Sequence, residues 1–102
     1  MEIIFFDQSV EDFLASLKKP VIAKILRTLD LLEKFGNKLG MPHSKKIEKD
    51  LFELRIRGKE EVRIFYCFHK NSAYLLHGII KKSNTIPRKA ISLAKRKIKA
   101  LA

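Results

Sequence analysis

Apolar residues follow two helical patterns in the first third of the chain, after a short strand-like run. Residues 2–6 (Glu-Ile-Ile-Phe-Phe) are apolar and β-prone, which predicts a first strand. Apolar side chains then recur at helical spacing over residues 10–17 and again over residues 22–32. The signals that place the helix ends are Ser9 with Asp12 as a capping box, Pro20 in the first turn of the second helix, and Gly36 at its end.

The pattern changes to a period of two in the second half of the chain. Residues 37–46 have the composition of a loop, and apolar and charged side chains then alternate over residues 52–57, which predicts a half-buried strand with one charged face. Residues 62–69 and 73–81 are two further strand-like runs, joined by short turns. Three strands with short connections predict an antiparallel meander.

These elements predict a single α+β domain of residues 1–102 in the order βααβββα. The first strand is expected beside the meander in an antiparallel sheet, with the helices packed on one face. The last helix follows Pro87, and Ala90, Ile91, Ala94, Ile98 and Leu101 are expected to face the core. Its opposite arc carries Arg88, Lys89, Lys95, Arg96 and Lys99.

The net charge of the chain indicates what kind of partner it binds. The chain has 22 Lys and Arg against 11 Asp and Glu, a formal net charge of +11. Residues 1–17 carry four acids and no Lys or Arg, whereas residues 81–102 carry eight bases and no acid. A field of this size attracts polyanions and speeds encounter with them. We interpret the excess as a nucleic-acid footprint, with a merely solvated basic face as the alternative.

The same composition bears on the compartment. Cys67 is the only cysteine, so no disulfide forms within the chain, which fits a reducing environment. No stretch approaches the roughly 18 apolar residues that span a bilayer. The N-terminus has no basic region ahead of its apolar run, as a signal peptide would have. We therefore expect a cytoplasmic protein with no membrane partner.

A search for standard catalytic motifs gives little. The three histidines and Cys67 show no zinc spacing, and four glycines form no phosphate-binding loop, so we expect no metal and no cofactor. Cys67 and His69 share a strand face and form a conceivable nucleophile pair. Cys67 lies within Tyr-Cys-Phe, however, which is more typical of a residue inside a sheet.

Charged residues on the strands remain as the candidate site. Cleavage of RNA by its own 2′-hydroxyl needs a proton acceptor, positive charge on the phosphorane oxygens and help for the leaving 5′-oxygen. Arginine suits the second role because its fork binds two phosphate oxygens together. The candidates are Glu53 as a base, Arg55, Arg57 and Arg63 as phosphate contacts, and His77, Lys81 or Lys82 as sources of charge or a proton.

Each candidate has a structural alternative. Glu53 is placed to pair with Arg63 or Arg55 across the sheet. A histidine on an apolar strand, such as His77, is more often a core residue than a catalyst. Tyr66 and Tyr74 are likewise more typical of core or rim positions than of acids. The pattern alone therefore supports RNA binding better than catalysis.

Three motifs in sequence order resemble the phage-derived, HigB-like branch of the RelE toxin superfamily. The first is Leu-Phe-Glu-Leu-Arg at residues 51–55, and the second is Val-Arg-Ile-Phe-Tyr at residues 62–66. The third is Leu-Leu-His-Gly-Ile-Ile-Lys-Lys-Ser at residues 75–83, followed by Pro87 and a helix rich in Ala, Lys and Arg. The two-helix N-terminal half matches in layout rather than in motif.

This resemblance implies a microbial-RNase-like α+β fold and a toxin encoded beside an antitoxin. Members typically cleave mRNA, often in the ribosomal A site, by metal-independent attack of the 2′-hydroxyl. Arg63 matches the arginine placed on the scissile phosphate, and Arg55 falls at or near another basic position of the active site. Lys81 or Lys82 matches the basic residue that ends the last strand. Lys45, Lys46 and Lys49 fall where members follow the RNA or ribosome backbone.

This chain departs from the family pattern at positions that concern the catalytic base and acid. RelE has a lysine where this chain has Glu53, and its terminal tyrosine has no clear counterpart near Arg88, so the base and acid are not assigned. ParE-type relatives inhibit DNA gyrase and are not nucleases.

The first hypothesis is an endoribonuclease toxin that is a monomer or forms a complex with its antitoxin. That antitoxin is expected to be an acidic helix-turn-helix protein. In this hypothesis Arg57, Arg88 and Lys89 also contact the RNA. The alternative is a non-catalytic binding toxin, such as a ParE-like gyrase inhibitor, or an RNA-binding module.

Overall fold

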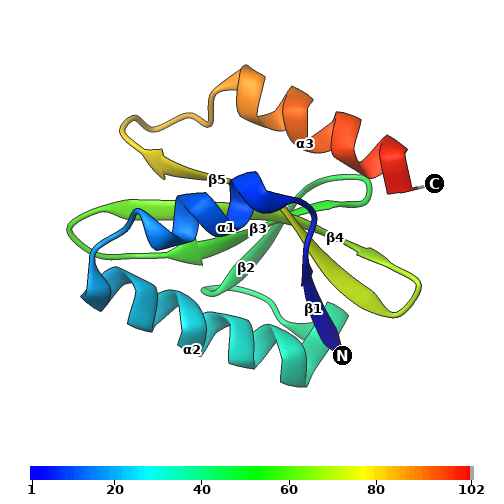
Figure 1. Cartoon of the computed structure of the whole chain (residues 1–102), viewed down its shortest axis with the longest axis horizontal. Coiled ribbons are helices and arrows are strands. Elements are labelled where there is room, and N and C mark those ends of the chain that lie inside the picture. Colours follow the sequence, from blue (N-terminus) through cyan, green and yellow to red (C-terminus); the bar gives the residue numbers. More distant parts are fainter. Residues whose placement is uncertain (102) are drawn as a thin grey trace.

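The computed structural model describes residues 1–101 and is built around a five-stranded mixed sheet flanked by three helices (Figure 1). The strand order is β1-β5-β4-β3-β2. No helix in this described part is both long and apolar enough to cross a membrane. The elements are β1 (Glu2–Phe5), α1 (Gln8–Ala15), α2 (Lys19–Phe35), the 3₁₀ turn η1 (Gly36–Lys38), β2 (Ser44–Glu48), β3 (Leu51–Ile56), β4 (Glu61–His69), β5 (Ser72–Lys81) and α3 (Arg88–Leu101).

The predicted meander is confirmed as β3, β4 and β5, and β1 joins it as expected. The pairing of β1 with β5 is parallel, so the sheet is mixed rather than wholly antiparallel. The loop predicted over residues 37–46 is partly wrong, because β2 begins at Ser44 and pairs with β3. Its sequence, Ser-Lys-Lys-Ile-Glu, lacks an alternating apolar face, since an edge strand buries little of itself.

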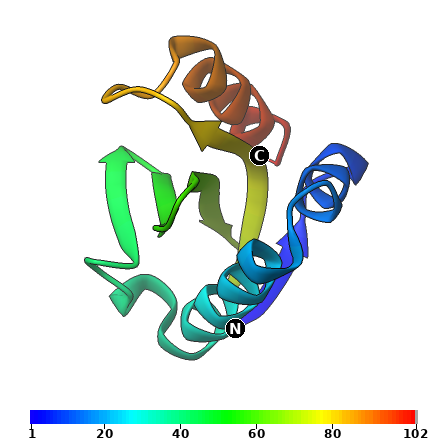
Figure 2. The same cartoon turned by 90° about the vertical axis from the view of Figure 1, so that its left-hand side faces the viewer.

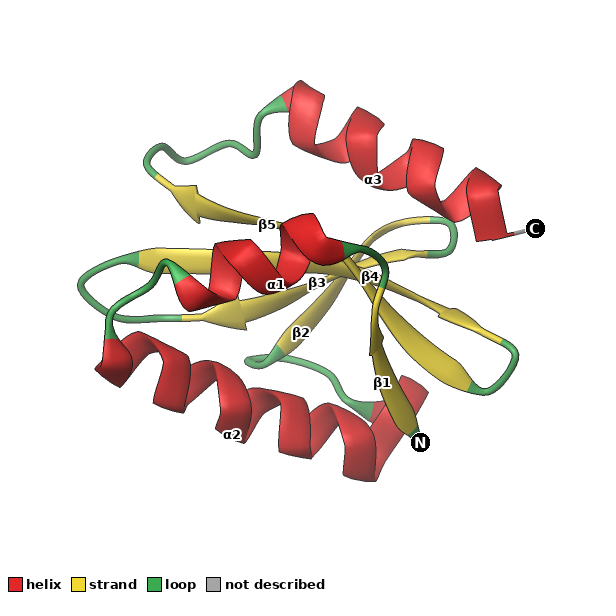
Figure 3. Ribbon diagram, viewed as in Figure 1, coloured by secondary structure: helices red, strands yellow, loops and turns green. Residues whose placement is uncertain are grey.

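The helices cover both faces of the sheet, which corrects the expectation that they share one face (Figures 2 and 3). On one face, Ile25 and Leu29 of α2 pack with Ile64 and its neighbours in β3 and β4. On the other, Ala90 and Ala94 of α3 pack with strand residues of opposite parity. The reason is that β4 is apolar on both faces, which a buried central strand permits.

The helix ends agree with two of the three sequence signals. Pro20 lies in the first turn of α2, and Gly36 ends that helix with φ of +56°, a backbone conformation that glycine adopts without penalty. The capping box at Ser9 is wrong, because α1 begins one residue earlier, at Gln8, after the extended Asp7. The Ser9 hydroxyl donates instead to Asp7 Oδ1 over 2.6 Å.

The basic arc of α3 is exposed as predicted, but Lys97 is buried among the helix contacts. Its ammonium donates to the carbonyl of Leu76 over 2.7 Å and pairs with Asp7 Oδ2 at 3.1 Å. Leu76 is the extra residue at a bulge in β5, where the partner register shifts between Phe65 and Tyr66. Lys97 therefore ties α3 to both the sheet and the start of α1.

Replacing Lys97 with methionine is expected to lower the free energy of unfolding by about 2 kcal/mol, because hydrogen bonds to a charged group contribute roughly 1.5–3 kcal/mol. Methionine keeps the apolar stem, so the loss reports the ammonium contacts alone. Urea unfolding measures the change. Lys99→Met is the control, since Lys99 is exposed on the same helix; equal effects of the two substitutions would contradict the assigned role of Lys97.

Candidate functional site

Strand pairing gathers the predicted site residues on the face of the sheet that α3 partly covers. Arg55 of β3 lies directly opposite Arg63 of β4. Two guanidinium groups facing each other across adjacent strands repel unless carboxylates lie between or beside them. Two carboxylates do so, Glu53 and Glu61, and together the four residues form what we call the arginine pair and its counter-ions.

Glu53 lies beneath the arginine pair and is buried, with 4% of its surface exposed. Its Oε1 is 3.9 Å from Arg63 Nε, and its Oε2 is 3.7 Å from Arg55 Nε. Both carboxylate oxygens thus face a guanidinium, as the structural alternative for Glu53 predicted. The predicted pairing across the sheet is confirmed for Arg63 of β4, while Arg55 pairs with Glu53 along β3 itself.

Glu61 is a site residue that the sequence reading missed. Its Oε1 accepts a hydrogen bond from Arg63 Nη2 over 3.0 Å and pairs with Arg57 Nε at 3.2 Å. Its Oε2 accepts from the backbone N–H of Gly58 over 3.1 Å. That N–H and the Arg63 guanidinium lower the pKa of Glu61. The signal was present, because Glu61 and Arg63 are two apart on a strand and so share a face.

Arg63 is the least exposed of the arginines, at 1%. Besides Glu61, it donates from Nη1 to the carbonyl of Val62 over 3.0 Å. A guanidinium has five N–H donors, so three remain without a hydrogen bond within residues 1–101. The buried polar atoms without a hydrogen bond in this part of the chain are Glu53 Oε1, Arg55 Nε and Arg63 Nε.

Exposure increases from Arg63 outward along this face. The side chain of Arg55 is 15% exposed and that of Arg57 is 63% exposed. Lys81 lies opposite Glu61 at the end of β5, and Lys82 follows it immediately. An anion approaching from solvent therefore meets Arg57 and Arg55 first, and Arg63 adds charge from below.

His77 lies on the same face but one step further along β5. It is opposite Phe65, with the two rings stacked at a centroid distance of 6.4 Å. Burial is the main cause that lowers the pKa of His77, and the Lys97 ammonium lowers it further. His77 is therefore neutral at pH 7 and has a ring nitrogen able to accept a proton.

The remaining predicted RNA contacts are spread over the surface rather than gathered at one place. Lys45 lies opposite Glu53 and shares its face, whereas Lys46 lies opposite Phe52 and points to the other face. Lys49 lies in the turn between β2 and β3, at the opposite end of β3 from Arg57. Arg88 and Lys89 are exposed in the first turn of α3.

Comparison with known proteins identifies this arrangement. The family described as phage-derived Gp49-like proteins matches residues 12–99, most of the chain. The chain belongs to this Gp49-like family. The family is one of RelE/HigB-like toxins, in agreement with the resemblance seen in the strand motifs. Among curated proteins, none matches the chain.

The Gp49-like match contains the arginine pair, its counter-ions and every other predicted site residue. It also contains Cys67, which is buried, and burial raises the pKa of its thiol to about 11. A thiol of that pKa carries almost no thiolate at pH 7, so the conceivable Cys67–His69 nucleophile pair is wrong. Within residues 1–101, no three His, Cys, Asp or Glu side chains gather as a metal site.

Proposed function

We propose that this Gp49-like protein is a cytoplasmic endoribonuclease toxin that cleaves mRNA through the arginine pair. In the proposed reaction the 2′-hydroxyl loses its proton and attacks the adjacent phosphorus. The bond from phosphorus to the 5′-oxygen breaks, and that oxygen takes up a proton. The products are a 2′,3′-cyclic phosphate and a 5′-hydroxyl end.

The observation that carries the proposal is the cross-strand pairing of Arg55 with Arg63. Two arginines on adjacent strands, held by Glu53 and Glu61, are oriented before any substrate arrives. Fixed positive charge aimed at developing oxyanion charge is the largest contribution that a protein makes to phosphoryl chemistry. The Nε atoms of both arginines face Glu53, so in this proposal their Nη groups are the donors to the phosphate.

The surroundings of Glu53 and His77 in the fold favour His77 as the proton acceptor. Both Glu53 oxygens face guanidinium groups, so this carboxylate acts as a counter-ion in the proposal. His77 is neutral at pH 7 because burial and Lys97 lower its pKa. Lys81 and Lys82, at the end of β5, are proposed to supply further positive charge to the phosphate.

The proposed partners follow from family and charge. Membership of a toxin family implies an antitoxin, and with a net charge of +11 on this chain we propose an acidic one. We propose mRNA as the substrate, engaged on the ribosome.

Induced expression of the protein, with growth and mRNA 5′ ends followed together, tests the proposed function. We expect growth arrest accompanied by new mRNA 5′-hydroxyl ends within minutes of induction. Growth arrest without new ends would replace the proposal with a non-catalytic toxin, and DNA gyrase would be the first target to examine. No arrest and no new ends would overturn both.

Glu61→Gln is expected to reduce cleavage by about tenfold, because Arg63 and Arg57 lose the carboxylate that orients them. Single-turnover rates on a defined mRNA bound to ribosomes measure the change, and the loss should appear in the maximal rate more than in the concentration that gives half of it. Glu11→Gln, exposed on α1 and without an ion pair within residues 1–101, is the matched control. Equal rates for the two variants would contradict a positioning role for Glu61.

The same variant has a pH signature. The pKa of Glu61 is lowered from 4.5 in the folded protein, so its stabilising ion pairs are complete above pH 4.5. They are lost as the pH falls through the folded-state pKa. Between pH 5 and pH 3 the wild-type protein should therefore lose more stability than Glu61→Gln, as measured by urea unfolding.

A further inference from the structure

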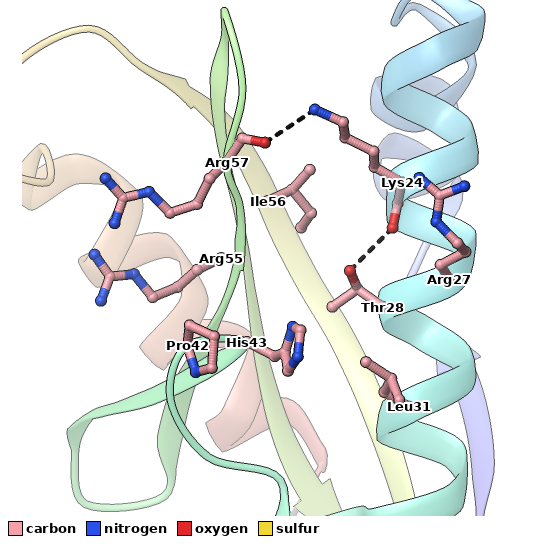
Figure 4. A pocket seen from close by; sticks show the side chains of 9 residues that line it. All are labelled: Lys24, Arg27, Thr28, Leu31, Pro42, His43, Arg55, Ile56 and Arg57. Atoms are coloured by element: carbon pink, nitrogen blue, oxygen red, sulfur yellow. Dashed lines mark hydrogen bonds between the residues drawn. The ribbon is translucent and has the colours of Figure 1, made fainter.

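A basic groove runs between α2 and β3, on the opposite side of β3 from the arginine pair (Figure 4). It consists of two adjoining hollows of about 530 and 360 Å³, which share Lys24, Ile56 and Arg57 in their walls. One hollow extends toward Pro42 and the other toward the turn between β3 and β4. We call the two hollows together the α2–β3 groove.

The charge of the α2–β3 groove is almost entirely positive. Glu60 is the one carboxylate among its lining residues. Several of its basic side chains, such as those of Arg27 and Lys59, form no ion pair within residues 1–101. The basic lining residues are Lys18, Lys24, Arg27, Arg55, Arg57 and Lys59.

The groove is continuous with the candidate site because β3 is the edge of the sheet at this point. The pairing of β2 with β3 ends where Ser44 faces Leu54, and the next hydrogen bond joins Arg55 N–H to the His43 carbonyl. Beyond it, Lys24 of α2 donates to the carbonyl of Arg57 over 3.1 Å. Within the described residues, therefore, no strand pairs with the outer edge of β3 beyond Leu54.

Two side chains connect the groove with the site. Arg55 and Arg57 line the groove, and Figure 4 shows their guanidinium groups extending to the side of β3 away from α2. Lys24 reaches from α2 toward Arg57 in Figure 4, and Arg27, which lies along α2, also lines the groove. A polyanion that leaves the site past the exposed Arg57 thus meets further positive charge around the strand edge.

We propose that the α2–β3 groove binds the phosphate backbone of the RNA strand outside the cleaved dinucleotide. The inference rests on the proposed function for the identity of the strand, and it adds a second surface to the site. Lys and Arg side chains that have no ion pair and are spaced along a groove suit a phosphate backbone, because each contact with a phosphate releases condensed counterions. The basic lining of the groove continues from Arg55, near the end of β3, to Lys59 in the turn that follows, so the groove offers contacts to more than one phosphate.

Uncleavable 2′-O-methyl RNA of two lengths, a trinucleotide and a 16-mer, tests the proposal by binding alone. In the double variant Arg27→Gln, Lys59→Gln, affinity for the 16-mer should fall by about 25-fold at 0.1 M salt, since each contact contributes about 0.7 to the salt slope for single strands. The slope itself should fall by about 1.4. Affinity for the trinucleotide should stay unchanged, because it occupies the site only.

The matched control is Lys38→Gln with Lys70→Gln, which removes the same charge from two exposed turns away from the groove. Equal loss of 16-mer affinity in the two double variants would overturn the proposal, since only net charge would then matter. Unchanged RNA affinity with weakened antitoxin binding would overturn it in favour of a protein-docking groove. If the wild-type protein cuts no RNA but the length-dependent loss persists, the proposed function fails and the groove assignment stands.

Discussion

Arg63→Ala is expected to reduce RNA cleavage by at least about 100-fold, the usual result of removing one preorganised donor to a developing oxyanion. Arg63 is held by Glu61 and by the carbonyl of Val62, and it lies directly opposite Arg55. Its loss removes one of two guanidiniums from the proposed phosphate site. Single-turnover cleavage of a defined mRNA bound to ribosomes, with mRNA 5′-end mapping after induction in cells, measures the effect.

Stability must be measured alongside, because Arg63 is buried and its removal leaves Glu53 with one counter-ion fewer. Arg63→Lys is the second variant, since it keeps the positive charge and loses the two-oxygen fork. We expect Arg63→Lys to fold and still to cleave at least tenfold more slowly than the wild type. A folded Arg63→Ala or Arg63→Lys protein with full activity would show that Arg63 has no part in cleavage.

Glu53→Gln is expected to lower the free energy of unfolding by about 3 kcal/mol, the range for breaking a buried ion pair by removing one partner. Glutamine keeps the size and shape of the side chain but leaves the buried Arg63 and the largely buried Arg55 facing each other with one carboxylate fewer. Urea unfolding at pH 7 measures the change. Glu48→Gln is the control, because Glu48 forms an exposed ion pair with Lys95.

The same variant separates the two roles considered for Glu53. If Glu53 is a counter-ion, Glu53→Gln lowers the free energy of unfolding, and cleavage by the folded variant keeps its pH dependence. A general base would instead be revealed by unchanged stability and a loss of cleavage of about 10²- to 10⁴-fold, with the acidic limb of the pH–rate profile abolished. That second outcome would contradict the counter-ion assignment and remove His77 from the proton-acceptor role.

The fold illustrates where sequence patterns are informative. The alternation of apolar and charged residues over β3 predicted both the strand and its charged face, because the side-chain period of a strand is two. β2 was missed because it is a short, charged edge strand whose existence depends on hydrogen bonds to β3 rather than on a buried face. The distribution of helices over two faces was missed because residues 64–68 of β4 are apolar without alternation, and such a run does not say which helix covers which side.

Some features of the candidate site could likewise be predicted from the sequence, and others could not. The sequence by itself determined the residue types, their alternation on β3 and the large positive charge, because these depend only on local spacing and composition. Only the tertiary structure decided that Arg55 faces Arg63, since cross-strand register is set by the turn and by packing. It also decided that Lys97 is a buried clamp, because its contacts with Leu76 and Asp7 join residues that are far apart in the sequence. The place of Glu61 beside Arg63, by contrast, follows from their spacing of two on β4.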